Sequence, residues 1–287
     1  MRDTSDADLE RVVAGLVERL ERRYFGKYRG FVVDSADPLG LARLRLRVPS
    51  VLGPDVVTGW ASACVPYGGA DDQGLLFLPD RDAGVWVEFE EGDLEFPIWT
   101  GTFWSKPDSG SQVPRPNDSD GAEADEVQDP ITRKIVKTAK GHTLQFEDAD
   151  GDESILVVDG VNGHVLVLDS AGITVTDGVN GHEMVLDSSG ITLTDGKNSG
   201  NQVVLDSSGL TLTDSNHNTI TMGASGITLG SGAVQSMVLG DALKLAVTTF
   251  VTTLNTHTHL GNLGAPTSPP MVPMQLDVQV SSKQKVE

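Results

Sequence analysis

HVLVLDSAGITVTDGVNG (residues 164–181), HEMVLDSSGITLTDGKNSGN (182–201) and QVVLDSSGLTLTDSNHN (202–218) are three successive copies of one repeat. A fourth, eroded copy follows at 219–232, and a longer first copy starts at residue 142. Each copy holds two short runs in which apolar and polar residues alternate, the pattern of a β-strand. The repeat therefore predicts that the second half of the chain is a periodic β-structure.

The apolar residues of one repeat limit how the chain can build a core. Met184 and Leu186 share one side of the first strand, and Ile191 and Leu193 share one side of the second. Each strand thus offers two apolar side chains, too few for a solitary chain to wrap a dry interior. Three chains around one axis each need to supply only a third of that interior, and they can pair their edges. The sequence predicts an intertwined trimeric β-helix.

The alternative is a single-chain calcium-binding β-solenoid, because Asp and Gly are frequent in the turns. Its signature is a nine-residue unit of the form G-G-x-G-x-D. In this chain Asp169, Asp187 and Asp206 are 18 and 19 residues apart, and no such unit occurs. The trimer is therefore the favoured interpretation.

The first part of the chain has two different periods. Residues 1–26 contain apolar positions at helical spacing and predict one amphipathic helix, which packs either on the next domain or against a partner subunit. These positions are Leu9, Val12, Val13, Leu16, Val17, Leu20 and Tyr24. Residues 27–105 change to strand periodicity and predict a small closed barrel. Its expected strands are 28–33, 42–48, 60–65, 75–78, 84–89 and 97–104.

Composition divides the remainder. Residues 106–127 are rich in Pro, Ser, Asp and Gly and predict a linker. Residues 128–236 form the predicted β-helix, and residues 237–287 form a C-terminal tip region. In this last region five apolar residues at helical spacing predict a helix: Leu243, Val247, Phe250, Val251 and Leu254.

His257 and His259 are the candidate metal ligands. Residues i and i+2 of an extended segment point to the same side, so two imidazoles converge in each chain and six converge in a trimer. Six nitrogens suit an octahedral transition metal such as iron, at one ion per trimer. The alternative is that both are polar residues of a Gly- and Pro-rich surface loop. His142, His164 and His182 each head a strand of the repeat, where we expect them at the turn edges in contact with solvent.

Charge and motif content exclude several functions. The net charge is −20, and residues 141–287 hold only 4 of the 21 basic side chains but 16 of the 41 acidic ones. Such a surface repels nucleic acid and anionic lipid. We find no catalytic motif and expect a structural protein, not an enzyme. The single cysteine, Cys64, is expected to be a buried apolar residue. The polar N-terminus predicts a product made in the cytoplasm without a signal peptide.

Two stretches of the barrel region resemble a known family. PDRDAGVWVEFEEGD (residues 79–93) and PIWTG (97–101) resemble the OB-fold barrel that begins phage baseplate spike proteins of the assembly protein V type. Related barrels begin the spikes of type VI secretion and contractile injection systems. SGITLTD (189–195) resembles the trimeric β-helix needle of the same proteins, and SSKQKVE (281–287) is similar to their usual terminus.

The resemblance implies a function. A homotrimeric needle would sit on a tail hub, assemble into the baseplate of a phage tail or injection particle, and pierce the target envelope in a transient mechanical contact with its membrane. It also implies iron at His257 and His259, and an effector or tip-cap protein as a further partner. Residues 105–127 are too short for an inserted lysozyme domain, and only residues 1–24 precede the barrel, so the hub is expected to be a separate protein. The alternative is a binding module in which the barrel grips a glycan or an effector.

Overall fold

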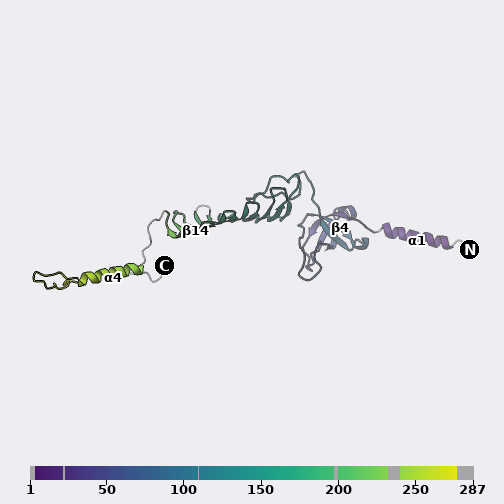
Figure 1. The fold of residues 1–287 in the computed structure, drawn as a ribbon. Helices are drawn as coiled ribbons and strands as arrows, with labels where there is room; N and C mark the ends of the chain where they lie inside the picture. The colour runs from purple at the N-terminus through teal and green to yellow at the C-terminus, as the bar shows by residue number, and fades with distance from the viewer. Residues whose placement is uncertain (1–3, 22, 109, 197–199, 232–239, 277–287) are drawn as a thin grey trace. The chain divides into compact units, whose positions relative to one another are not determined.

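The computed structural model describes residues 4–21, 23–108, 110–196, 200–231 and 240–276 (Figure 1). Internal contacts divide the chain into two units, Met1–Ala171 and Gly172–Glu287. No helix within the described residues is long and apolar enough to cross a bilayer. The terminal motif at 281–287 lies outside the described residues.

The first unit begins with a helix and a closed barrel. Helix α1 (Thr4–Glu21) lies where helical periodicity predicted it. The barrel has the strand order β1-β2-β3-β5-β4, with β4 paired to β1. Its elements are β1 (Tyr28–Asp34), β2 (Leu44–Arg47), α2 (Pro49–Leu52), β3 (Val57–Ala63), β4 (Gly84–Phe89), η1 (Glu90–Gly92) and β5 (Pro97–Thr102).

The barrel has a core of its own. Nine buried side chains from all five strands and the adjoining segments fill it: Val32, Leu44, Leu46, Val48, Ala61, Val85, Val87, Phe89 and Trp99. The indole Nε1 of Trp99 donates a hydrogen bond to the carbonyl of Ala42 at 3.1 Å, so the polar end of this ring is satisfied inside the apolar core. The barrel therefore encloses its own apolar core, as expected for a closed sheet.

Two expectations for the barrel region were wrong. Residues 75–78 do not form a strand, because β3 pairs with β2 and β5 while β4 pairs with β1 and β5, which leaves no free edge. They lie in the long β3–β4 connection, where Leu76 and Phe77 are exposed. Cys64 is exposed and not buried, because β3 ends at Ala63 and the chain leaves the barrel there.

Four further strands complete the first unit. They are β6 (Lys134–Lys137), β7 (Thr143–Glu147), β8 (Ser154–Val158) and β9 (Val165–Leu168), and each pairs antiparallel with the next along the chain. The 106–127 segment, expected to be a linker, contains no strand but is held against these strands, as shown below.

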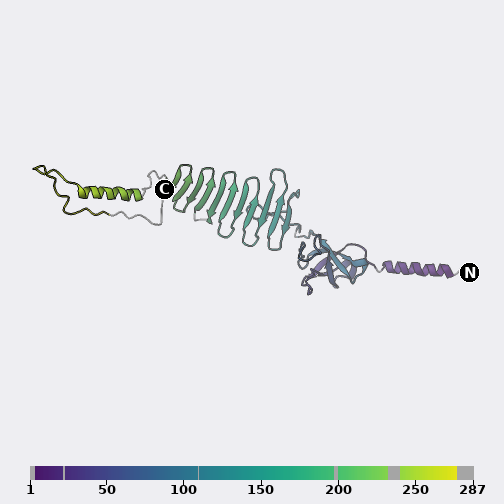
Figure 2. The same cartoon turned by 60° about the horizontal axis from the view of Figure 1, so that its bottom comes forward.

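The second unit continues the same pattern. Seven strands pair antiparallel in chain order, and Figure 2 shows them lying side by side as successive rungs of one layer. They are β10 (Gly172–Thr176), β11 (Glu183–Asp187), β12 (Gly190–Asp195), β13 (Asn201–Asp206), β14 (Gly209–Thr213), β15 (Thr219–Gly223) and β16 (Gly226–Leu229). A calcium-binding solenoid stacks its rungs in parallel, so this antiparallel pairing excludes that alternative for the described strands. Helix α4 (Gly240–Thr256) follows, as the spacing predicted.

The turn that joins the two strands of a repeat is held by the same type of hydrogen bond in successive repeats. At the Asp-Ser-Ser-Gly turn, the Asp187 carboxylate accepts a hydrogen bond from the Ser189 amide at 2.7 Å, and Asp206 accepts one from Ser208 at 2.7 Å. A short acidic side chain that bonds its own backbone two residues on favours a tight turn. The Asp of each repeat therefore fixes where one strand ends and the next begins.

A glycine opens every second strand because two backbones meet there. Gly190 has φ +143°, and a Cβ at this position would lie 2.0 Å from the carbonyl oxygen of Leu205 on the next strand. Gly172 and Gly209 are in the same situation, with gaps of 2.0 and 1.9 Å. Only glycine adopts this conformation and permits this approach at no steric cost. The periodic glycine thus sets the register of each strand pair.

Gly190→Ala should destabilise the sheet more than Gly226→Ala. Both glycines have positive φ, at +143° and +113°, but a Cβ at residue 226 meets nothing within 4 Å. The difference isolates the clash with Leu205, for which we expect about 1–3 kcal/mol of additional destabilisation. Urea unfolding followed by circular dichroism measures it, and equal losses in the two variants would refute the close-approach explanation.

Candidate association surface and histidine pairs

One face of the sheet in the second unit is apolar at its centre, and polar residues such as Asp195 and Asn201 lie on the same side at the strand ends. The register places two apolar residues of each strand opposite those of the next, for example Met184 opposite Leu193 and Leu193 opposite Val203. The full set is Ile173, Val175, Met184, Leu186, Ile191, Leu193, Val203, Leu205, Leu210, Leu212, Ile220, Met222, Ile227 and Leu229. We call these residues the apolar face. They confirm the assignment of Met184, Leu186, Ile191 and Leu193 to one side.

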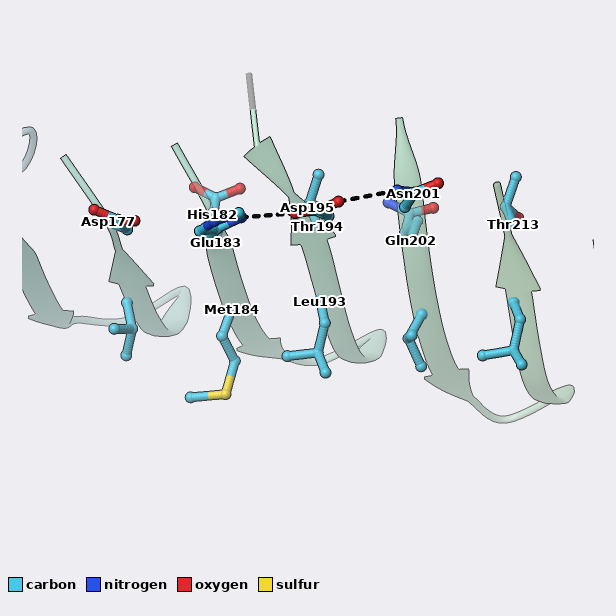
Figure 3. A pocket seen from close by; sticks show the side chains of 13 residues that line it. Asp177, His182, Glu183, Met184, Leu193, Thr194, Asp195, Asn201, Gln202 and Thr213 are labelled. Atoms are coloured by element: carbon cyan, nitrogen blue, oxygen red, sulfur yellow. Dashed lines mark hydrogen bonds and ion pairs between the residues drawn. The ribbon is translucent and has the colours of Figure 1, made fainter. Parts of the chain in front are cut away.

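Nothing described in the second unit covers the apolar face. Leu193 is 40% exposed, Leu205 43% and Ile227 65%. None of the described residues between 172 and 276 is buried. A shallow trough runs over five strands, lined at its base by Val175, Met184, Leu193, Val203 and Leu212. In Figure 3 the Met184 and Leu193 side chains project from this side of the ribbon. A contiguous exposed apolar surface of this kind marks an interaction site.

The opposite face has the character of a solvated surface. Its central row holds five threonines and two valines, and all seven side chains are half-buried. The row consists of Thr174, Val185, Thr192, Val204, Thr211, Thr221 and Thr228. Threonine suits both a strand and water. The two faces therefore differ in kind, which fixes the side that must be covered.

Strands β7–β9 of the first unit also have an exposed apolar face, but their opposite face is covered. Residues 113–133, here called the strap, lie on the reverse side of β7–β9. The backbone N–H of Asn117 donates a hydrogen bond to Gln145 Oε1 at 2.9 Å, and Gln145 Nε2 donates one to the backbone carbonyl of Asn117 at 2.9 Å. Beside this pair the strap closes over Leu156, Val158, Val165 and Val167, which are buried. Val157 and Phe146, on the other side, remain 40% and 39% exposed.

A buried ionic group holds the far end of the strap. The Glu147 side chain is only 4% exposed and accepts hydrogen bonds from Arg133 Nε at 2.7 Å and Gln128 Nε2 at 3.0 Å. Burial alone raises the pKa of Glu147, but hydrogen bonds from Thr132, the Ala149 amide and Arg133 outweigh it and lower the pKa to about 2. The sequence analysis did not predict this contact, because it joins residues 14 and 19 positions apart.

Two of the repeat histidines, His142 and His182, each lie beside an aspartate. His142 Nδ1 is 3.1 Å from Asp159 Oδ1, and His182 Nδ1 is 2.9 Å from Asp195 Oδ1. Asp195 also accepts a hydrogen bond from Asn201, which replaces histidine in the next repeat (Figure 3). The His142 and His182 side chains are about half exposed. Their edge position agrees with the expectation, and their pairing with aspartate is a feature that the sequence analysis missed.

His257 and His259 are brought together just beyond α4. Their ring centroids are 5.1 Å apart and the ring planes meet at 86°. His257 Nδ1 is hydrogen-bonded to the carbonyl of Leu254, which leaves Nε2 as the nitrogen available for a ligand. Past these rings the chain turns back, and Asn255 makes two hydrogen bonds, of 2.9 and 2.7 Å, with the backbone of Met274. The described part of one chain contains no group of three or more metal-ligating side chains.

The barrel also presents a cation on an aromatic surface. The Arg29 guanidinium carbon lies 5.7 Å from the centroid of Trp86 and 5.3 Å from that of Phe103. Trp86 and Phe103 are 5.2 Å apart, and Phe31 packs edge-on against Phe103. All four side chains lie on the outside of the barrel, because the alternate residues Val32, Val85 and Val87 fill the core.

Comparison with known families assigns this barrel. Residues 28–104 match the family described as the Type VI secretion system/phage-baseplate injector OB domain. The barrel is thus similar to an injector OB domain over its whole length, and we refer to residues 28–104 by that name. The match confirms the resemblance to baseplate spike proteins, on a region that includes both stretches that carried it at residues 79–101. No curated protein matches the chain.

Glu147→Gln should remove an acid-sensitive component of strap stability. The folded pKa of Glu147, about 2, lies below its ordinary value of 4.5, so its stabilising contribution is complete above pH 4.5 and is lost as the pH falls towards 2. Hydrogen exchange of the strap amides, corrected for intrinsic rates, should show opening below pH 4.5 in the natural chain and a weaker acid dependence in the variant. Glu123, whose pKa is lowered by its hydrogen bond with Lys137, supplies the remaining dependence. Glu153→Gln, an exposed acid in the neighbouring turn, is the control and should retain the acid dependence.

Proposed function

We propose that this chain forms the homotrimeric central spike of a contractile tail or phage-like injection machine. In this role the injector OB domain seats the spike on a hub, and the repetitive sheet forms an intertwined trimeric needle that pierces the target envelope. The work is mechanical and not catalytic, and the chain acts after assembly into the baseplate. Support comes from the family of the barrel and from the uncovered apolar face.

The apolar face is the observation that carries the proposal. A sheet that carries fourteen apolar side chains on one side, none of them buried, is not an acceptable surface for a soluble particle. The same residue types repeat along all seven strands, so a matching partner must repeat with the same period. Another copy of the chain satisfies this condition. Three copies enclose a prism with the apolar faces inside and the threonine rows outside, and a closed ring leaves no unmatched face.

Helix α4 offers a second surface on which copies of the chain can associate. Leu243, Val247, Phe250 and Leu254 follow one another at spacings of four, three and four residues, the pattern of a coiled-coil seam. Leu243 and Phe250 are 43% and 60% exposed in the single chain. We propose that three α4 helices pack along this seam, at the distal end of the needle.

The metal proposal follows from the same symmetry. Each chain supplies two neighbouring imidazoles, His257 and His259, so three chains supply six nitrogen donors. Nitrogen donors in this number fit an octahedral transition metal, and we propose one iron ion per trimer. When bound, the ion would cross-link the three chains; His257 is held for this role by its hydrogen bond to Leu254.

The hub is the proposed partner of the barrel, and an effector or tip-cap protein is a further one. Arginine and tryptophan are enriched among the residues that dominate protein interfaces. Arg29 and Trp86 form such a pair on the outer barrel surface. We propose this surface as the part of the injector OB domain that contacts another baseplate protein.

Leu193→Asp should prevent trimer formation, whereas Thr192→Asp should not. The two residues are adjacent on β12 and point to opposite faces, so the same charge is introduced inside the proposed prism or outside it. A carboxylate inside would be buried without a partner, once in each chain. Light scattering after size exclusion should give three chains per particle for the natural chain and Thr192→Asp, and smaller or aggregated species for Leu193→Asp. A folded monomer of the natural chain would refute the proposed function.

His257→Ala and His259→Ala should each remove bound metal. Elemental analysis of purified trimer should find about one transition-metal ion per three chains in the natural protein and at least about tenfold less in either variant, since every variant loses three of six donors. His217→Ala, which alters an exposed turn histidine, is the control and should leave the metal content unchanged. Equal metal content in all four proteins would exclude these histidines as ligands.

A further inference from the structure

Helix α1 exposes an apolar stripe. Leu9, Val12, Val13, Leu16 and Val17 are 62%, 58%, 50%, 52% and 46% exposed, and all lie on one side of the helix. At 100° per residue they span an arc of about 140°. That arc is wider than the two-position seam of a simple coiled coil and corresponds to a helix flanked by neighbours on two sides.

The positions on this stripe fit a parallel association of identical helices. If Val13 is placed at heptad position a, Leu9 and Leu16 fall at d, Val12 at g and Val17 at e. In a parallel coiled coil the g residue of one helix faces the e residue of its neighbour five positions later. Val12 and Val17 are five positions apart, so the apolar g residue of each helix would contact the apolar e residue of its neighbour. Identical helices therefore match one another at these positions. A helix that docked into a groove of another protein would not need apolar residues at both g and e.

Charge and anchoring allow the helices to meet. Residues 1–26 carry five basic and six acidic side chains, almost balanced in a chain of net charge −20, so their mutual repulsion is small. The chain just after α1 is fixed to the barrel, because the Tyr24 amide donates to the Gly92 carbonyl at 2.9 Å. In a trimer three helices would therefore start from equivalent points on three barrels.

We propose that α1 forms a parallel three-stranded coiled coil with the α1 helices of two other copies of this chain. The proposal rests on the proposed trimeric spike and adds a second, helical association surface to it. An isolated helix of 18 residues has little stability in water. Linkage to a trimer raises the effective concentration of the other two helices, and this makes a short bundle stable.

Disulfide cross-linking in a chain with one engineered cysteine tests the proposal. The exposed Cys64 is first replaced by serine, which leaves no natural thiol. Val13→Cys and, separately, Leu9→Cys then place a thiol on the stripe, where equivalent positions of parallel helices approach one another. Arg11→Cys, on the opposite side of α1, is the matched control. Under mild oxidation we expect at least about tenfold more covalent dimer with either stripe cysteine than with the control.

The mass of each particle, measured on the same samples, separates the possible failures. Three chains per particle with strong cross-linking at Val13 and Leu9 supports the coiled coil. Three chains per particle with cross-linking no greater than that of Arg11→Cys overturns it, because α1 then packs elsewhere while the spike remains intact. A particle without three chains overturns both this inference and the proposed function.

Discussion

Water is kept from the apolar side of a sheet only when something lies on that side. In residues 172–231 the chain makes one layer of antiparallel strands, and among the described residues none becomes buried. Backbone N–H and C=O groups within the layer form hydrogen bonds between neighbouring strands. What the layer lacks is therefore burial of its apolar side chains and not hydrogen bonds. Burial of apolar surface is the main favourable contribution to folding. The described strands of the layer obtain little of this contribution from one another, because their apolar side chains share one uncovered face.

Most positions of the repeat have an identifiable structural role in the layer. A glycine opens every second strand where the neighbouring carbonyl approaches within 2.0 Å of a would-be Cβ, and an aspartate closes the preceding turn. Between them, alternating side chains sort leucine and isoleucine to one face and threonine to the other. Further repeats can be added to the layer without a change in the type of residue needed at any position. This property suits a long, stiff element of uniform cross-section.

The first unit shows how the same chain behaves when it covers its own surface. The barrel closes on itself and buries nine apolar side chains. On β7–β9 the strap covers the reverse side through Asn117, Gln145 and Glu147, while the side of Phe146 and Val157 stays open. The first unit thus combines a barrel that has its own core with strands that are covered on one side only.

The sequence alone determined the local structure. Alternation and helical spacing located α1, α4, five barrel strands and the repeat strands, because these patterns reflect the periods of single elements. The sequence also determined that Met184 shares one side of β11 with Leu186, and that Leu193 shares one side of β12 with Ile191. This follows because alternate residues of any strand point to opposite faces. The injector OB domain was recognisable from residues 79–101 before any coordinates.

Tertiary structure decided what depends on segments that meet across the fold. Residues 75–78 have strand composition but no free edge to join, because the barrel closes without them. Residues 106–127 have the composition of a linker, yet Asn117 is hydrogen-bonded to Gln145 and both residues are buried. The pairs His142–Asp159 and His182–Asp195 likewise form only when neighbouring strands align. Local period is a property of consecutive residues, whereas burial and pairing are properties of distant ones, and only the folded chain brings those together.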